Sequence, residues 1–374
     1  MSLPESKRSG RRLRVAVLMG GASSEREISL VSGKMVTGAL DPERYDVMAL
    51  DTRDLLRLTG ERPLALVAVA EARAGVGCAV QAAGAERLPL IPPWQGGAGG
   101  DTGFQSPAER PDVVFIALHG KGGEDGTVQG MLEVMGLPYT GSGVLASALA
   151  MDKVMSKRMF RTAGIPVIDG IFITRAALSG CTEENFRQAS LREVETHLGF
   201  PVFVKPNAGG STCGCTLVDR PEALFEAVQL ALSLDVTALI EKYVRGTEIT
   251  IGVLDFAGEP LTALPVIEIV PKGEYYDYES KYSEGGSEHI IPARLPEGIV
   301  KRAQEIAREC HTLLGCRGVS RTDIIVAGSE LYVLEVNTIP GMTPTSLLPQ
   351  AAEYAGISFA QLLDRLIGSA LKEI

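Results

Sequence analysis

The sequence lacks cysteine pairs and long apolar runs, and each absence excludes a class of protein. The six cysteines, at positions 78, 181, 213, 215, 310 and 316, form no CxxC pair, so we expect no zinc site. Cys213 and Cys215 are spaced unsuitably for zinc or a usual disulfide, which favours free thiols in a cytoplasmic protein. No stretch approaches the ~20 apolar residues of a membrane span, and Val15–Met19 is too short for a signal-peptide core.

The chain also lacks an excess of positive charge. Its formal net charge of −10 argues against a general affinity for nucleic acid or anionic membranes. Local phosphate binding is still compatible with this charge. The 374 residues suffice for two or three domains, and 45% apolar with 5% aromatic residues is an ordinary balance for a globular protein.

The most informative segment is a predicted β-hairpin near the C-terminus. Two apolar runs, Gly318–Ala327 and Leu331–Val336, flank a Gly-Ser-Glu turn. With a turn centred near Ser329, Asp323 lies opposite Glu335, and Arg321 lies opposite Asn337. Facing carboxylates repel unless a cation lies between them, and two carboxylates plus an amide suit Mg²⁺ shared with phosphates. The alternative is an exposed hairpin that carries ordinary surface charge.

The order of strands and helices predicts an α/β protein with three segments. Residues 1–141 alternate strand, glycine turn and helix, which is typical of an open parallel sheet whose ligands gather at the carboxyl ends of its strands. Residues 142–240 mix helices with short strands around a glycine-rich loop, and 241–374 contain longer strands and closing helices. Residues 73–108 are expected to form a long surface excursion.

Two strand ends in the first segment carry candidate binding residues. Glu25 follows the turn Gly-Gly-Ala-Ser-Ser and begins a helical pattern. There it could bind a substrate ammonium, or it could simply stabilise the helix macrodipole. His119, in Leu-His-Gly, ends the next strand and is either a site residue or a satisfied polar residue.

Lysines and glycines in the second segment favour a phosphate site. Lys205 precedes a loop, Pro-Asn-Ala-Gly-Gly-Ser-Thr-Cys-Gly, whose backbone N–H groups could wrap phosphate oxygens. The alternative is a flexible hairpin, because glycine and serine favour turns for conformational reasons. Lys153, in Met-Asp-Lys, adds a second cation. Downstream, Glu241 closes a strand and Glu248 opens another, where they could contact a nucleoside, and the tyrosine-rich stretch Lys272–Glu288 is expected to form a lid.

In this order the motifs closely resemble the D-alanine–D-alanine ligase family of the ATP-grasp superfamily. The resemblance extends from Arg14 to the C-terminus. It rests on the segments GGASSEREIS, LHGKGGEDG, YTGSG, MDK, YDYESKY and EVNTIPGMT. It implies a three-domain ATP-grasp fold in which two antiparallel sheets hold ATP. It also implies ligation of two D-alanine molecules through a D-alanyl phosphate for peptidoglycan synthesis.

The resemblance also implies a role for each matching residue. The nucleotide residues would be Lys153, Lys205, Ser211, Glu241, Lys242, Glu248 and Lys281. Two Mg²⁺ ions, with Mn²⁺ as a substitute, would be held by Asp323, Glu335 and Asn337. Binding and reaction of the substrates would involve Glu25, His119, Ser211, Tyr282, Arg321, Gly341, Ser346 and Leu347. The base that accepts the proton of the incoming amine is not assigned. A homodimer is the expected assembly.

Three alternatives bear on this prediction. Lactate-forming relatives replace the lid tyrosine, so Tyr282 favours a dipeptide product, whereas use of D-serine depends on small changes around the second site. A catalytically inactive ATP-grasp module would have lost the Mg²⁺ ligands or Arg321, and all of them are present. The glycine loop departs from relatives that carry a charged residue before the Gly-Ser pair, so its mobility is expected to differ.

Overall fold

A computed structural model describes residues 11–52, 110–180, 182–186, 190–210, 213–271 and 287–372. The first strands form a parallel sheet in the order β2–β1–β3, made of Tyr45–Asp51, Leu13–Met19 and Val113–Ile116. Val15 of β1 pairs with Val47 on one side and with Val113 on the other. The prediction of an open parallel sheet at this end of the chain is confirmed.

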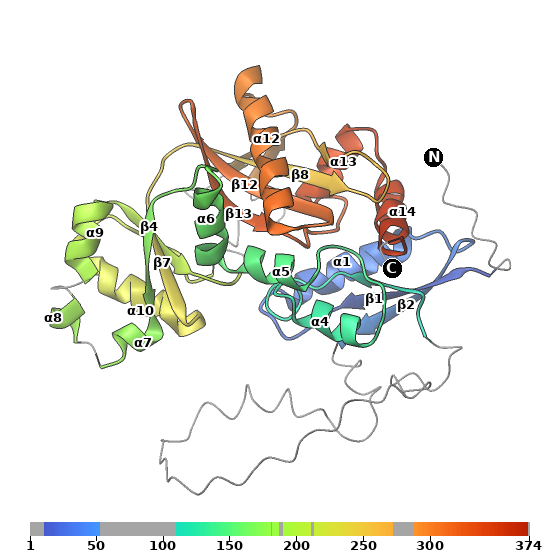
Figure 1. Ribbon diagram of the computed structural model, residues 1–374, viewed down its shortest axis with the longest axis horizontal. Coiled ribbons are helices and arrows are strands. Elements are labelled where there is room, and N and C mark those ends of the chain that lie inside the picture. Colours follow the sequence, from blue (N-terminus) through green and yellow to red (C-terminus); the bar gives the residue numbers. More distant parts are fainter. Residues whose placement is uncertain are drawn as a thin grey trace, which may run out of the picture.

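Helices cover both faces of the parallel sheet, which explains why β1 is apolar without alternation. Val15 and Val17 pack on the face of α1 (Arg26–Ala39), whereas Ala16 and Leu18 pack on the face of α4 (Thr127–Val134). Successive strand residues point to opposite faces, so each face receives an apolar row. Figure 1 shows this sheet at the end of the molecule where α14 also lies.

A larger antiparallel sheet has the order β11–β10–β8–β12–β13, with β9 paired to β8. Its strands, from β8 to β13, are Thr247–Asp255, Thr262–Ala263, Ile267–Pro271, Ser287–Ile290, Gly318–Ala327 and Glu330–Asn337. Helices α5 (Val144–Met151), α6 (Lys153–Thr162) and α12 (Glu297–Leu314) pack on it (Figure 1). Helices α13 (Leu347–Tyr354) and α14 (Phe359–Ala370) join its core to that of the parallel sheet.

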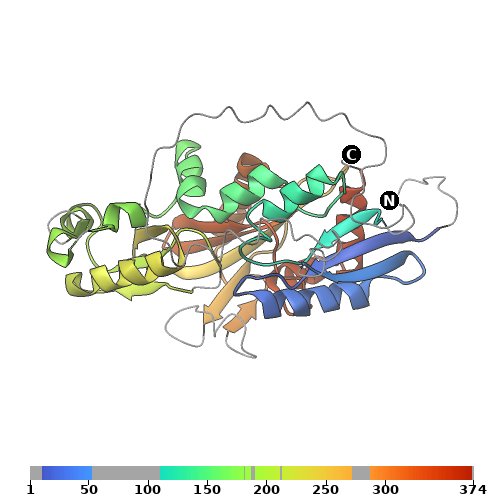
Figure 2. The same cartoon turned by 90° about the horizontal axis from the view of Figure 1, so that it is seen from below.

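A four-stranded antiparallel sheet, β4–β7–β5–β6, forms a separate lobe (Figure 2). Its strands, from β4 to β7, are Gly170–Thr174, Val202–Pro206, Thr216–Val218 and Thr237–Lys242. The lobe also contains α7 (Arg175–Leu178), α8 (Glu183–Phe186), α9 (Arg192–His197), the 3₁₀ helix η3 (Pro221–Ala223) and α10 (Leu224–Leu234). Val202, Val204, Val228 and Ile240 are among its fully buried core residues.

The predicted hairpin is confirmed in both its existence and its register. Strands β12 and β13 pair antiparallel, with Asp323 opposite Glu335 and Arg321 opposite Asn337. The pairing shifts between Asp323 and Ile324, where a bulge interrupts the ladder. The acids that define the predicted metal site therefore face one another at the end of the hairpin away from its turn.

One predicted strand is wrong in its extent. The run Leu261–Val270 divides into β9 and β10 because Pro265, which lacks a backbone N–H, lies in the break. On either side of it, Leu264 donates to the Gly252 carbonyl and Val266 accepts from the Ala293 N–H.

Other predictions concern single groups and segments. Cys213, Cys215, Cys310 and Cys316 are free thiols, as expected. No helix among the described residues is long and apolar enough to span a membrane. The excursion at 73–108 and most of the lid, 272–286, lie outside the described residues, as do Ser211, Lys281 and Tyr282.

Candidate active site

A cleft of about 910 Å³ lies between the four-stranded sheet and the large sheet, and the first turns of the parallel-sheet segment close one side. Strands β5 and β7 contribute to one wall, and β8, β10, β12 and β13 to the other. Eight of the predicted site residues line this cleft: Glu25, Lys153, Lys205, Glu241, Lys242, Glu248, Asp323 and Glu335. Residues from all three segments of the sequence thus meet in one place.

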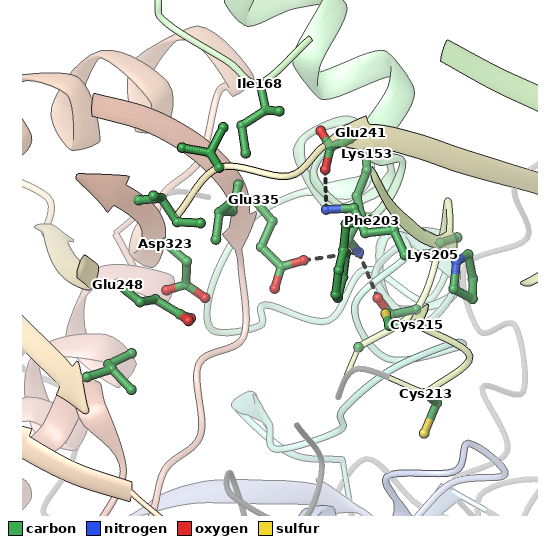
Figure 3. A pocket seen from close by; sticks show the side chains of 18 of the residues that line it. Lys153, Ile168, Phe203, Lys205, Cys213, Cys215, Glu241, Glu248, Asp323 and Glu335 are labelled. Atoms are coloured by element: carbon green, nitrogen blue, oxygen red, sulfur yellow. Dashed lines mark hydrogen bonds and ion pairs between the residues drawn. The ribbon is translucent and has the colours of Figure 1, made fainter. Parts of the chain in front are cut away.

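The facing acids of the hairpin are held by cationic and hydroxyl groups. Thr250 donates from Oγ1 to Asp323 Oδ1 at 2.5 Å, and the Arg321 guanidinium donates to both oxygens of Asp323 at 3.0 and 2.9 Å. Glu335 forms an ion pair with Lys153, with 3.0 Å between Oε2 and Nζ. Figure 3 shows Glu335 between the lysines on one side and Asp323 on the other.

This donor set fits a magnesium ion that also binds a nucleotide. Two carboxylates and the amide of Asn337 supply hard oxygen atoms, but too few to complete an octahedron, so phosphate oxygens and water must supply the rest. The Asn337 side-chain oxygen accepts the Ile339 N–H at 3.0 Å, which fixes its orientation. The described residues contain no cluster of three or more His, Cys, Asp or Glu side chains suited to a metal.

The two predicted lysines are fixed by contacts between α6 and the glycine loop. Lys153 donates from Nζ to the Gly209 carbonyl at 2.8 Å. Asp152 caps α6 by accepting the Met155 N–H, and Asn207 of the glycine loop accepts the Val154 N–H at 2.8 Å. The first turn of α6 is therefore anchored to the loop that follows Lys205.

Lys205 is 8% exposed and pairs with Glu241 at 2.6 Å. Burial lowers the pKa of Lys205, but the Glu241 carboxylate outweighs that effect, so the pKa is raised overall. Lys205 therefore stays charged at the wall of the cleft. Its partner Glu241 is 2% exposed, which is an unusual position for a carboxylate unless cations surround it.

Glu25 is held between the turn after β3 and the glycine loop. A Cβ at Gly120 would lie 2.6 Å from Glu25 Oε2, and one at Gly210 would lie 2.9 Å from Oε1. Gly120 also has a φ of +71°, which favours glycine. A Cβ at either position would therefore displace the carboxylate from where it lies. Gly210 directly precedes Ser211, which the resemblance places in a network with Glu25.

His119 is 6% exposed and lies near enough to Glu25 for their charges to interact. Its Nε2 lies 3.0 Å from Ser32 Oγ, and its ring hydrogen-bonds to the backbone of Ile339. Burial lowers the pKa of His119; Glu25 opposes this shift, and Arg321 adds to it. The groups predicted for the first substrate are therefore electrostatic neighbours of the hairpin arginine.

The residues predicted for the second substrate lie at the start of α13. Ser346 precedes this helix, and its Oγ accepts the Thr343 N–H at 3.2 Å. A Cβ at Gly341 would lie 2.8 Å from Ser346 Oγ, so the two residues are adjacent. Leu347 is 8% exposed and packs into the core that joins the parallel sheet to the large antiparallel sheet. His119, Arg321, Asn337, Gly341, Ser346 and Leu347 do not line the large cleft itself.

Comparison with known families agrees with this geometry. Residues 14–142 match the model described as "D-ala D-ala ligase N-terminus", and residues 159–368 match "D-ala D-ala ligase C-terminus". The chain belongs to the D-alanine–D-alanine ligase family.

Individual relatives of this ligase family resemble the chain over nearly its whole length. D-alanine–D-alanine ligase from Syntrophobacter fumaroxidans is 44% identical over 97% of this chain and 99% of the relative. The enzyme of that name from Desulforamulus reducens is 42% identical over 96% of this chain and 99% of the relative. The solved Bacillus anthracis ligase complexed with ATP is 30% identical, with a TM-score of 0.69 over 96% of this chain and 98% of that chain. The predicted ATP-grasp fold is confirmed.

Sequence reasoning missed Lys157, a buried lysine of the ligase core. It pairs with Glu241 and donates from Nζ to the Val333 carbonyl at 3.3 Å. Burial lowers the pKa of Lys157 to about 8, although Glu241 opposes the shift. The pKa of Glu241 is lowered, because two lysines outweigh the effect of its burial. Lys157 follows Lys153 by one helical turn and so lies on the same face of α6, a signal that the sequence contained.

Glu124 is the second missed residue. It lies in the motif LHGKGGEDG and accepts the Gly120 N–H at 2.6 Å. Burial raises the pKa of Glu124 to about 8, and the charge of Glu25 adds to this effect. A carboxyl group that is mostly protonated at neutral pH thus lies beside the predicted substrate ammonium site.

Proposed function

We propose that this protein uses ATP to join two D-alanine molecules into D-alanyl-D-alanine, with release of ADP and phosphate, for peptidoglycan precursor synthesis. The observation that carries the proposal is the confirmed register of Asp323 against Glu335 at a cleft lined by Lys153 and Lys205. The 44% identity to a named D-alanine–D-alanine ligase supports the choice of substrate. By family resemblance the enzyme is a cytoplasmic homodimer.

On the nucleotide side, residues of this chain would orient ATP along the cleft. Lys153 and Lys205 would contact the α- and β-phosphates, and Lys281 the γ-phosphate. Glu241 and Lys242 would bind the adenine, and Glu248 the ribose hydroxyls. The oxygens of Asp323, Glu335 and Asn337 would hold magnesium, which neutralises phosphate charge while bound. Positioning and charge neutralisation supply most of the rate enhancement in phosphoryl transfer.

On the substrate side, Glu25 would hold the ammonium of the first D-alanine, with His119 nearby. A carboxylate oxygen of this D-alanine attacks the γ-phosphorus, and ADP leaves. Phosphorylation is required because oxide is a poor leaving group, whereas phosphate is a good one. Ser211 and Tyr282 would complete a network that closes over Glu25.

The second D-alanine would bind through its carboxylate at Ser346, beside Leu347. Its amine attacks the acyl carbon, and a tetrahedral intermediate collapses to dipeptide and phosphate. Arg321 and the Gly341 N–H would stabilise the oxyanion. The Arg321 guanidinium already lies against Asp323, so the two halves of the reaction meet at this hairpin.

A D-serine-using ligase is the second candidate. The solved VanG D-Ala:D-Ser ligase from Enterococcus faecalis is 31% identical to this chain, with a TM-score of 0.71. Named D-alanine–D-alanine ligases reach 44% and 42%, which favours D-alanine at the second site.

The test measures phosphate release from ATP and Mg²⁺ with D-alanine alone, and then with D-serine, D-lactate or L-alanine added. We expect full turnover with D-alanine alone and little increase with the others. A rate that depends on added D-serine would favour the second candidate, and no turnover with D-alanine would exclude the proposed function.

A further inference from the structure

A buried ion-pair cluster lies behind the lysine wall of the cleft. Glu241 of β7 pairs through Oε1 with Lys157 of α6 and through Oε2 with Lys205 of β5. Lys157 also donates to the carbonyl of Val333 on β13. Through Glu241 and Lys157, these contacts tie α6 to both antiparallel sheets.

The two lysines of the cluster differ in their access to the cleft. Lys205 lines the cleft, where a phosphate can approach it, whereas Lys157 does not line it and is 5% exposed. When Lys205 turns towards a phosphate, its bond to Glu241 weakens. A buried carboxylate that loses its cations becomes protonated or draws the nearest cation back. Only Lys157 can stay with Glu241 throughout.

We propose that Lys157 is a positioning residue for the nucleotide, which anchors Glu241 from behind the cleft so that Lys205 is free to bind phosphate. The inference rests on the proposed function of Lys205 in ATP binding. It explains why the buried carboxylate of Glu241 has two lysine partners although only Lys205 lines the cleft.

The charges around Lys157 make the proposal sensitive to pH. The groups that act on its ammonium are Glu241 from β7, Lys205 from β5 and Glu335 from β13. Burial lowers the pKa of Lys157 to about 8, whereas the pKa of Lys205 is raised. As the pH rises, Lys157 is therefore the first to lose its proton. Glu241 then depends on Lys205 alone, and Lys205 is withheld from the nucleotide.

The experiment measures equilibrium binding of a non-hydrolysable ATP analogue, and separately kcat and the KM values for ATP and D-alanine. We expect Lys157→Met to weaken analogue binding and raise the KM for ATP by about tenfold or more, with kcat at saturating ATP and the KM for D-alanine within about threefold of wild type. In the wild type, analogue affinity should fall as the pH rises above about 8, and in Lys157→Met this slope should vanish. Lys301→Met, which breaks an exposed pair with Glu297, is the matched control and should change neither quantity.

Two measurements keep the outcome decisive. If Lys157→Met does not fold, Lys157→Arg keeps a permanent cation beside Glu241 and should bind the analogue without a loss of affinity above pH 8, and the wild-type pH profile needs no variant. Analogue affinity that is flat above pH 8, or equal losses in kcat and both KM values, would overturn the proposal. Failure of D-alanine turnover with normal analogue binding would instead count against the proposed function alone.

Discussion

Arg321→Ala tests whether the hairpin joins nucleotide and substrate chemistry. The guanidinium forms two charge-assisted bonds to Asp323, and the side chains of the two residues are 15% and 7% exposed. Removing one partner of a buried ion pair costs about 3–5 kcal/mol, because the other charge is left unpaired. Thr250 still donates to Asp323, so we expect the lower end, about 3 kcal/mol, in the free energy of unfolding.

The same variant should lose catalysis through a separate effect. Loss of an oxyanion donor lowers kcat by about 10²–10³-fold. Binding of the ATP analogue without metal should stay near wild type, because Arg321 does not line the nucleotide cleft. Added Mg²⁺ should restore much of the lost stability, since a cation at Asp323 replaces the missing guanidinium charge.

Urea denaturation with and without Mg²⁺, together with phosphate release, measures these effects. Arg302→Ala is the control, because its bonds to Glu305 and Glu309 are exposed and should contribute less than about 1 kcal/mol. If Arg321→Ala kept kcat within tenfold of wild type, or lost no more stability than the control, the assignment of Arg321 would be refuted.

Three further predictions concern other groups of the site and core. Gly120→Ala places a Cβ 2.6 Å from the Glu25 carboxylate, at a residue whose φ is +71°. In steady-state kinetics the KM for the first D-alanine should therefore rise at least about tenfold, and the KM for ATP should change little. Burial lowers the pKa of His311, so the folded state resists protonation of this side chain. The free energy of unfolding should therefore fall as the pH drops below about 6.5. In His311→Gln, urea denaturation should show a smaller fall over the same pH range. Burial raises the pKa of Glu124 to about 8, so the folded state binds a proton here more tightly than the unfolded state does. The free energy of unfolding contributed by this proton is present at low pH and is lost as the pH rises towards 8. In Glu124→Gln, urea denaturation should show a smaller fall over this range.

Much of the fold was predictable because its signals are local. The Gly-Ser-Glu turn predicts the hairpin and, approximately, its register. The pairs next to the turn, such as Ala327 with Glu330, would by themselves place Asp323 against Leu334, and the bulge between Asp323 and Ile324 shifts Asp323 to Glu335. The apolar run of β1 predicts a strand buried on both faces. Pro265 was present in the sequence and signals the break between β9 and β10, although the surrounding apolar run concealed it.

Contacts between distant segments were harder to predict from the sequence. Glu25 and Gly210 come from separate segments and lie close together. The resemblance to known ligases predicted only that the next residue, Ser211, joins a network with Glu25. The sequence places Arg321 and Asp323 on one face, but it does not say that the guanidinium folds along the strand to bind both carboxylate oxygens. Long, flexible side chains have several rotamers, and tertiary packing selects among them.

The partners of Lys157 could not be predicted from the sequence either. Its spacing from Lys153 predicts a shared face of α6, which for two lysines usually means solvent. The structure buries both of them, because Lys153 meets the carboxylate of Glu335 and Lys157 meets that of Glu241. The predicted domain boundaries at 141 and 240, and the assigned roles of the site residues, stay predictions.

The transfer of an oxygen atom tests the central claim most directly. D-alanine labelled with oxygen-18 in its carboxylate is incubated with the enzyme, ATP and Mg²⁺, and the released phosphate is analysed by mass spectrometry. An acyl phosphate leaves one carboxylate oxygen on phosphorus, so the account predicts one labelled oxygen in each phosphate for every dipeptide formed. Unlabelled phosphate released together with dipeptide would contradict it.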